Sequence, residues 1–325
     1  LRKMAVKLPA LPAVTGATPC ERLSIQYSHP AWLVDAFIGR LGEVGAEALL
    51  KANNGEAVMA ARVNTLKTDA RTLISALQNE QADASLHPWL PDCLELRNTR
   101  YIERLRTFSE GYFYIQDPAA ILAVAAAGVK PGMLVIDACA APGGKSFASA
   151  IDMSGTGRII SCDINEKKLR RVTAGARRLG IEMIETRVMD ARVIHTEFIG
   201  KADIVLADVP CSGFGVIRKK PEIRYKTQQE TAGLPELQLQ IMKNLSHYVK
   251  PGGILLYSTC TLLKRENEDI IESFLDTRSD YFPEAFEFPE PAGQVKSGMT
   301  TLWPHIHGTD GFFICRLRRS KAGSG

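Results

Sequence analysis

The spacing of apolar residues changes its period along the chain, and the change falls near Gly111. Ahead of Gly111, segments of helical spacing alternate with short apolar runs typical of strands. One helical segment is interrupted around Gly42, and another follows Asp69, a favourable N-cap. The elements expected here are two short helices within 29–53, strands over 58–63 and 93–96, and a helix over 69–79. They predict a small α+β domain over 21–111, after an aperiodic tail at 1–20 that is rich in Pro and Ala.

After Gly111, apolar strands alternate with amphipathic helices, the pattern of a parallel sheet with crossover helices. The expected strands cover 133–137, 158–163, 185–189, 203–207 and 253–258, and the expected helices 119–127, 145–151, 166–179 and 234–249. Extended runs near Phe286 and over 311–317 predict an antiparallel hairpin that closes one edge of the sheet. The fold class predicted for residues 112–320 is therefore α/β.

Composition narrows the class of protein. A length of 325 residues suits two domains, and 45% hydrophobic with 23% charged residues is ordinary for a globular chain. We expect a cytoplasmic monomer, because neither a membrane-spanning run nor the apolar core of a secretion signal is present in the sequence. The 7 cysteines are scattered without a Cys-x-x-Cys pair, which argues against disulfides and bound metal. A net charge of +4 permits a polyanionic partner without requiring one.

The segment Asp137-Ala-Cys-Ala-Ala-Pro-Gly-Gly-Lys145 ends the first of these strands and opens a helix. Its small residues allow close approach of a ligand to the backbone, and a helix N-terminus attracts an anionic group. This favours cofactor binding over a structural turn, although the glycine spacing of dinucleotide and triphosphate loops is absent. Asp163 ends the second strand, where doubly wound folds place a ribose-binding acid, while Asn165 suits the helix N-cap. Asp190 follows the third strand and is either an adenine-binding group or a solvated loop carboxylate.

Two cysteines follow the fourth and fifth strands, Cys211 in Asp208-Val-Pro-Cys and Cys260 in Ser-Thr-Cys-Thr. Ligands of an open parallel sheet bind beyond the carboxyl ends of its strands, and neighbouring strands lie about 4.8 Å apart. We therefore expect both thiols to face one pocket beside the cofactor loop. Cys139, Cys162 and Cys315 lie in or beside strands and are interpreted as core residues.

Taken together, these motifs resemble the RNA cytosine-C5 methyltransferases of the Nol1/Nop2/Sun family, and most closely its bacterial Sun (Fmu, RsmB-type) branch, which modifies 16S ribosomal RNA. The resemblance covers about residue 29 to the end. The motifs that carry it are the segment 137–145, Asp208-Val-Pro-Cys-Ser-Gly-Phe-Gly-Val-Ile-Arg218, Tyr257-Ser-Thr-Cys-Thr261 with Glu266-Asn-Glu268, and His307-Gly-Thr-Asp-Gly-Phe-Phe313. The family's Asp-Ala-Pro-Cys is Asp-Val-Pro-Cys here. Many Sun-type members also carry an N-terminal NusB-like helical domain, for which residues 1–28 are too short, so we expect a piece of a longer chain or a short variant.

The resemblance implies a Rossmann-like methyltransferase fold with a mostly parallel, seven-stranded sheet, a small RNA-binding domain, and S-adenosylmethionine as cofactor. The implied cofactor-binding residues are Ala140, Pro142, Gly143, Gly144 and Lys145 for the methionine end, Asp163 for the ribose, Asp190 for the adenine, and Asp208 beside them. Cys260 is the implied nucleophile at C6 of cytosine, Asp208 binds the base, and Cys211 assists product release. Lys145 either supplies positive charge to the thiolates or anchors the cofactor's carboxylate.

The chemistry is consistent with these residue types. C5 of cytosine is a weak nucleophile until a thiolate adds to C6, and cysteine supplies that thiolate when its pKa is lowered. Loss of the C5 proton then requires a base, for which Cys211, acting through water, is the candidate.

The segment 216–226, directly after Cys211, contains five cationic residues: Arg218, Lys219, Lys220, Arg224 and Lys226. We expect them to bind RNA phosphates, and the alternative is that they are only a solvent-exposed surface of the loop. The expected substrate is a single-stranded or flipped-out cytosine, because C5 must leave the base stack. The favoured RNA is 16S rRNA, with tRNA as an alternative. A non-catalytic ribosome-assembly factor is a second alternative, and a DNA methyltransferase is disfavoured because it would attack with the Pro-Cys cysteine.

Overall fold

The computed structural model describes residues 16–99 and 101–321. It begins with two helices, α2 (Pro19–Tyr27) and α3 (Ala31–Asn53). Thr18 caps α2 by accepting a hydrogen bond from the Glu21 backbone, so this helix starts within the predicted tail, whose residues 1–15 lie outside the described part. Gly42, with a φ of 70°, kinks α3 and confirms the predicted interruption.

A small antiparallel sheet follows, in the order β2-β3-β1-β4. Its elements are β1 (Met59–Val63), α4 (Ala70–Asn79), β2 (Asp83–Leu86), β3 (Cys93–Arg97), α5 (Arg106–Ser109) and β4 (Phe113–Ile115). The predicted strands β1 and β3 are confirmed, and Asp69 caps α4 as expected. Strands β2 and β4 were missed because each is very short. Since Tyr114 of β4 pairs with Arg62 of β1, the small sheet extends past residue 111, where the sequence analysis placed the domain boundary.

The larger sheet contains the five predicted parallel strands in the order β9-β8-β5-β6-β7. These strands are β5 (Leu134–Asp137), β6 (Arg158–Asp163), β7 (Ile184–Val188), β8 (Ala202–Asp208) and β9 (Val249–Thr259). The helices beside them are α6 (Pro118–Ala127), α7 (Gly144–Asp152), α8 (Glu166–Leu179), α9 (Leu234–Ser246) and α10 (Glu268–Leu275). After β7 the chain returns to the other side of β5, so the strand order reverses between β5 and β8. Ligands of such sheets bind at this switch point.

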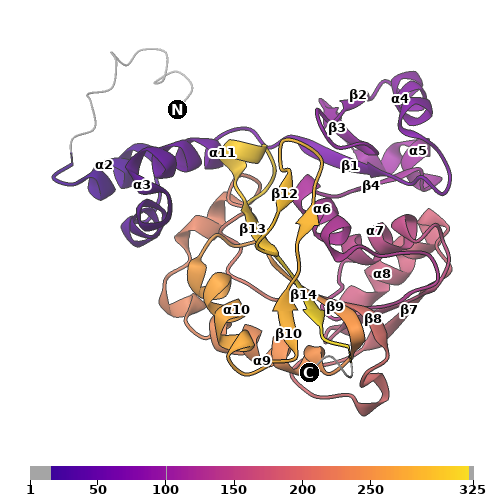
Figure 1. Ribbon diagram of the computed structural model, residues 1–325. Helices are drawn as coiled ribbons and strands as arrows, with labels where there is room; N and C mark the ends of the chain where they lie inside the picture. The colour runs from indigo at the N-terminus through magenta and orange to yellow at the C-terminus, as the bar shows by residue number, and fades with distance from the viewer. Residues whose placement is uncertain (1–15, 100, 322–325) are drawn as a thin grey trace.

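Alternating residues of the parallel strands supply two separate cores. Val135 and Leu206 pack with α6, α7 and α8, whereas Ile136 and Val205 pack with α9 and α10. Figure 1 shows these two groups of helices on opposite sides of the sheet. Burial on both faces explains why the strands are continuous apolar runs in the sequence.

The C-terminal segment extends the sheet differently from the prediction. Strand β14 (Phe312–Arg319) pairs antiparallel with β9, with β10 (Tyr281–Pro283) and with β13 (Met299–Leu302), which makes eight strands rather than seven. Phe286 was expected in the hairpin at the sheet edge. It lies instead in β11 (Phe286–Glu287), which pairs with β12 (Gln294–Val295) in a separate two-stranded sheet. Short extended runs carry no signal for which partner they pair with, so the tertiary contacts decide the pairing.

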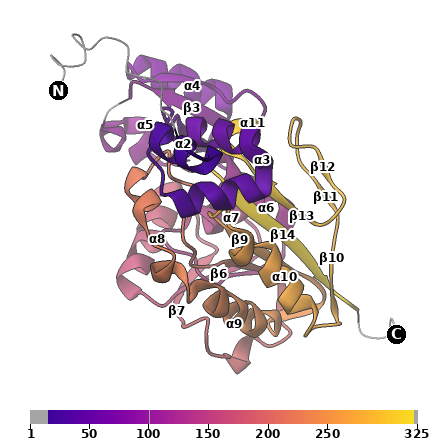
Figure 2. The same ribbon diagram turned by 90° about the vertical axis from the view of Figure 1, so that its left-hand side faces the viewer.

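Helices α2 and α3 support the loops that follow β8 and β9. Leu33, Phe37 and Leu49 share a buried cluster with Phe214 and Leu262, which lie shortly after the two cysteines of interest. The ring of Trp32 meets that of Phe214 edge to face at 5.3 Å between centroids. Figure 2 shows α2 and α3 at the same end of the molecule as the small sheet. Within the described residues, every helix is too short or too polar to cross a bilayer.

Candidate active site

The loop between β5 and α7 is shaped by its glycines. Gly143 is the N-cap of α7 with a φ of 114°, and a Cβ there would lie 2.4 Å from the ring of Phe147. A Cβ on Gly144 would lie 3.1 Å from the side-chain nitrogen of Gln116, a buried donor without a partner among the described residues. A side chain at either position would thus crowd the protein's own side chains, and without one the Gly144 backbone lines a cavity.

Asp137, at the end of β5, holds the start of α7 in place, a role that was not predicted from the sequence. It is fully buried, and its Oδ2 accepts a hydrogen bond of 2.7 Å from Ser146 in α7. Ser146 also contacts Ser161 of β6 at 2.7 Å. Burial raises the pKa of Asp137 to about 7, although the hydrogen bond from Ser146 opposes the shift. The sequence did not reveal this structural role, because an aspartate at the end of a strand can equally well contact a ligand.

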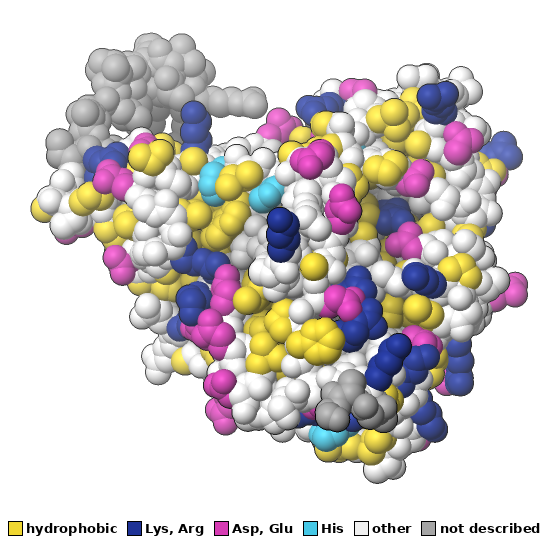
Figure 3. Space-filling view, viewed as in Figure 1, with side chains coloured by type: hydrophobic (Ala, Val, Ile, Leu, Met, Phe, Trp, Pro, Cys, Tyr) yellow, Lys and Arg dark blue, Asp and Glu magenta, His cyan; other side chains and the backbone are white. Residues whose placement is uncertain are grey.

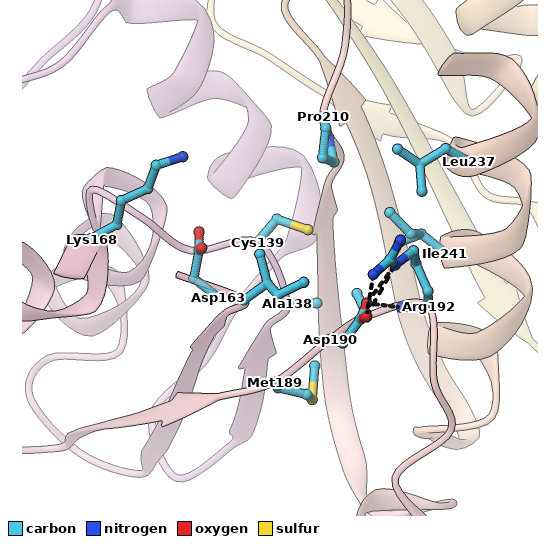
Figure 4. Close-up of a pocket in the computed structure, with 12 residues that line it drawn as sticks. Ala138, Cys139, Asp163, Lys168, Met189, Asp190, Arg192, Pro210, Leu237 and Ile241 are labelled. Carbon is cyan, nitrogen blue, oxygen red and sulfur yellow. Dashed lines mark hydrogen bonds and ion pairs between the residues drawn. The ribbon is translucent and has the colours of Figure 1, made fainter. Parts of the chain in front are cut away.

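A cavity of about 280 Å³ lies beyond the ends of β6 and β7. Asp163 and Asp190 line it from the strand side, while Leu237 and Ile241 of α9 lie opposite (Figure 4). Asp163 ends β6, and Asn165 caps α8, as predicted. Both carboxylate oxygens of Asp190 accept hydrogen bonds from Arg192 at 2.7–3.0 Å. Two acidic groups above an apolar wall suit the hydroxyl and amino donors of a nucleoside.

A second cavity of about 200 Å³ adjoins the first, since Cys139 lines both. Its walls include Ala140, Pro142, Gly144, Lys145 and Asp208. The structure thus brings the predicted methionine-end residues other than Gly143, and the predicted nucleoside residues, to two adjoining cavities at the sheet's switch point. Close backbone approach, an unpaired donor on Gln116 and the acidic pair fit S-adenosylmethionine, which these residues would hold.

The two predicted thiols meet at this edge of the sheet, with 3.3 Å between the sulfur atoms of Cys211 and Cys260. The hydrogen bond from Cys211 lowers the pKa of Cys260; burial and Asp208 oppose this shift, and Lys145 adds to it. The pKa of Cys211 lies well above its usual value because it shares this hydrogen bond and is buried. Of the two thiols, Cys260 therefore ionises more readily, and the thiolate is the form needed in a nucleophile.

Lys145 and Asp208 form an ion pair of 2.6 Å beside the thiols. Ser258 donates a hydrogen bond of 2.9 Å to the other oxygen of Asp208, and the ring of Phe312 lies 5.0 Å from the Lys145 nitrogen. Burial would lower the pKa of Lys145, but Asp208 outweighs it and raises the pKa above its usual value. Lys145 is consequently a fixed positive charge and not a proton donor at neutral pH.

The basic segment 216–226 only partly matches its predicted role. Arg224 is buried, and its guanidinium donates to Asn54 Oδ1 at 2.8 Å and to the backbone carbonyl of Pro221 at 3.1 Å. Lys226 donates to the carbonyl of Ser212 at 2.8 Å. Arg224 thus braces the protein itself, contrary to the expectation that it points toward a phosphate.

Arg218 and Lys219 belong to a network that the sequence analysis missed. Lys219 pairs with both Asp117, the N-cap of α6, and Asp310, which precedes β14. Arg218 donates to the carbonyl of Gly308 at 3.1 Å. Burial and the charge of Asp117 raise the pKa of Asp310 to about 7. These partners lie far apart in the sequence, so no local pattern could reveal them, whereas Lys220 remains exposed as predicted.

Glu266 and Asn267 are also part of the site. Glu266 is fully buried and accepts a hydrogen bond of 2.9 Å from the backbone nitrogen of Ser212, next to Cys211. Asn267 accepts from Thr259 at 2.6 Å and donates to the carbonyl of Thr261 at 3.0 Å, on either side of Cys260. Both residues were quoted as part of a motif, but their contacts depend on the fold.

The described residues contain no group of three or more His, Cys, Asp or Glu side chains that could hold a metal ion. The ring of His307 accepts a hydrogen bond of 2.9 Å from the Trp303 backbone.

The sheet with its switch-point loop, the acidic nucleoside cavity and the adjoining glycine loop define a Rossmann-like, S-adenosylmethionine-dependent methyltransferase. The chain belongs to the family of the 16S rRNA methyltransferases RsmB/F, whose profile matches residues 125–318. Residues 29–103 match the ferredoxin-like domain of the same group. These matches confirm the resemblance found in the motifs.

Individual proteins agree with the family. A probable ribosomal RNA small subunit methyltransferase B from Bacillus subtilis (strain 168) is 36% identical over 93% of this chain and 68% of its own length. The solved structure of PH0851 has 30% identity and a TM-score of 0.86, covering 98% of this chain and 71% of that one. A methyltransferase homolog protein from Pyrococcus horikoshii has 26% identity and a TM-score of 0.79, covering 94% and 100%.

Proposed function

We propose that this protein methylates C5 of a cytosine in RNA through a covalent adduct between Cys260 and C6 of the base. The observation that carries the proposal is the pair of thiols 3.3 Å apart, beside the ion pair of Lys145 and Asp208. A methyltransferase acting on a nitrogen or oxygen atom needs no thiol nucleophile. A free thiol at a ligand-binding edge is the nucleophile that C5 chemistry requires, and a second thiol beside it can assist product release. A reducing compartment such as the cytoplasm would keep both reduced.

In the first step, the thiolate of Cys260 forms a bond to C6. The electron pair displaced from the ring moves to N3, which takes up a proton from solvent. The carboxylate of Asp208 then accepts a hydrogen bond from the new N3–H group. Lys145 stabilises the thiolate beforehand and keeps Asp208 oriented through their contact of 2.6 Å. S-adenosylmethionine supplies the methyl group as an electrophilic sulfonium when bound.

In the release step, the C5 proton passes to water held near Cys211. The electron pair of the C5–H bond re-forms the C5–C6 double bond, Cys260 leaves as a thiolate, and N3 returns its proton to solvent. The sulfur atoms of Cys211 and Cys260 lie 3.3 Å apart, and a hydrogen bond donated by Cys211 across this contact would stabilise the departing sulfur. This is how Cys211 assists product release without itself forming a bond to the base.

A route for the RNA strand is suggested by two cavities that continue from the catalytic one. Ile115, 45% exposed, lines both the 200 Å³ cavity of Lys145 and a neighbouring cavity of about 330 Å³. Met59 lines this neighbour and a further cavity of about 420 Å³ that includes Arg97. Exposed apolar side chains along this line provide surfaces for unstacked bases. On the face shown in Figure 3, Lys and Arg are interspersed with acidic side chains, which would repel phosphates. Binding of RNA on this face would therefore depend on contacts with bases as well as on contacts with phosphates.

We infer 16S rRNA as the substrate because the family and its relatives carry that name. The test measures methyl transfer from labelled S-adenosylmethionine to unmodified 16S rRNA and to tRNA, with wild type, Cys260→Ala and Cys211→Ala. Loss of transfer in Cys260→Ala, with a denaturation-resistant RNA adduct in Cys211→Ala, is the expected result. Exchanged behaviour of the two variants would overturn the assignment of the nucleophile. Transfer to tRNA alone would overturn the substrate, and a folded wild type without transfer to either RNA would favour a non-catalytic binding factor.

A further inference from the structure

The two chemically identical thiols sit in different electrostatic surroundings. Cys211 lies between Pro210 and Ser212, and both neighbours are held by buried side chains. Gln238 donates to the carbonyl of Pro210 at 2.9 Å, and Glu266 accepts from the nitrogen of Ser212 at 2.9 Å. Gln238 also donates to the same oxygen of Glu266 at 2.9 Å. The loop that carries Cys211 is therefore fixed around one acidic side chain.

Glu266 is the unusual member of this group. It is fully buried, and both hydrogen bonds at its Oε2 come from N–H donors, the pattern expected of a carboxylate. Its Oε1 has no hydrogen-bond partner, and no ion pair involves Glu266, among the residues that the structure describes. A buried negative charge without a compensating cation acts strongly on nearby groups because the local dielectric constant is low.

The charges around Cys260 are arranged differently. Lys145 faces it from α7, while Asp208 and Asp310 face it from β8 and from the start of β14. Cys211 is affected by Glu266 and Asp208 instead, and Tyr257 of β9 lies near both of these acids. The Cys260 side of the pair thus has Lys145 together with the two acids, whereas Glu266 is on the Cys211 side. A cation on that side, Lys226, donates to the carbonyl of Ser212 at 2.8 Å and forms no ion pair with Glu266 among the described residues.

We propose that Glu266 is a positioning residue whose buried charge keeps the Cys211 thiol protonated, so that the negative charge of the sulfur pair resides on Cys260. Glu266 thereby favours Cys260 over Cys211 as the nucleophile. The adjacent Asn267 accepts from the Thr259 hydroxyl and donates to the Thr261 carbonyl, on either side of Cys260, so consecutive residues position the two thiols. This inference rests on the proposed function for its purpose, but its physical content concerns the free enzyme.

The test is alkylation of the free thiols by iodoacetamide over a range of pH, with the modified peptides quantified by mass spectrometry. Wild type should be labelled first at Cys260, since only thiolates react. In Glu266→Gln, which keeps the size and the acceptor of the side chain, labelling should move toward Cys211. The expected ratio of Cys260 to Cys211 labelling falls about tenfold, the effect of one unit in the difference between their pKa values. Glu272→Gln, which removes an exposed charge from α10, is the matched control and should leave the ratio unchanged.

Two results would overturn the proposal. One is a folded Glu266→Gln variant, shown by an unchanged circular dichroism spectrum, with the labelling ratio of wild type. The other requires no variant: preferential labelling of Cys211 in wild type would show that the charge resides on the wrong sulfur. Neither readout involves RNA or methyl transfer, so failure of the proposed function would leave this result standing. If methyl transfer is observed, its pH profile should shift in Glu266→Gln but not in Glu272→Gln.

Discussion

Arg224 and Lys220 lie four residues apart in one basic segment, and the structure predicts opposite roles for them. Arg224 is buried and donates to Asn54 at 2.8 Å, to Pro221 at 3.1 Å and to Ser28 at 3.3 Å. Lys220 is exposed. Replacement of each by methionine removes the charge and retains an unbranched side chain, so the two variants are matched.

The cost of Arg224→Met follows from its contacts. Two of its hydrogen bonds have ordinary lengths, and each bond from a charged donor contributes about 1.5–3 kcal/mol. Water and local relaxation recover part of this, so the free energy of unfolding should fall by about 2–4 kcal/mol. Lys220→Met should leave it within about 0.5 kcal/mol of wild type, as is usual for surface substitutions. Urea denaturation followed by circular dichroism measures both values.

RNA binding should respond in the opposite way. If Lys220 contacts a phosphate, Lys220→Met lowers the slope of log affinity against log salt by about 0.7, the value for one contact with a single strand. At temperatures where the Arg224→Met variant is still folded, its slope of log affinity against log salt should equal that of wild type. A stable Arg224→Met variant with a shallower slope would refute the reasoning, because it would show that the buried guanidinium is available to RNA.

Three further predictions concern the cofactor side of the site. Gly143→Ala should destabilise the protein by about 1–3 kcal/mol and weaken S-adenosylmethionine binding in calorimetry, because a positive φ and the Phe147 ring both oppose a Cβ. Gly200→Ala is the control, because Gly200 also has a positive φ, 66°, but open space where its Cβ would lie. Equal losses of stability and of cofactor binding in both variants would show that the contact between a Cβ at position 143 and Phe147 does not matter. Asp163→Ala should weaken cofactor binding about tenfold to a hundredfold, the loss of a charge-assisted hydrogen bond, and more than Asp190→Ala, whose carboxylate already binds Arg192. Finally, the pKa of Asp137 is raised to about 7, so the native state holds a proton that the unfolded state has lost. Its contribution to stability should therefore decline as pH rises from about 4 to 7, and Asp137→Asn should remove that decline; identical pH dependence of unfolding in both proteins would contradict this.

Much of the fold was predictable because local patterns specify it. Helix α8 spans Glu166–Leu179 as predicted, since its amphipathic period, the Asn165 cap and Gly180 all act within the helix itself. The parallel strands were predictable because burial on both faces leaves a run of apolar residues. The meeting of Cys211 and Cys260 also followed from local information, because neighbouring parallel strands end at one edge of the sheet.

Other features depended on contacts between distant segments. The charge pattern of residues 216–226 was plain in the sequence, but whether Arg224 faces solvent or Asn54 depends on how α3 packs beside that loop. The same holds for Lys219, whose partners Asp117 and Asp310 come from opposite ends of the larger domain. The titratable or polar group that a side chain carries is a property of its residue type, so the sequence alone determined which groups can react or bind. Its partners and its exposure are properties of packing, and only the tertiary structure decided whether a cation serves a ligand or the protein itself.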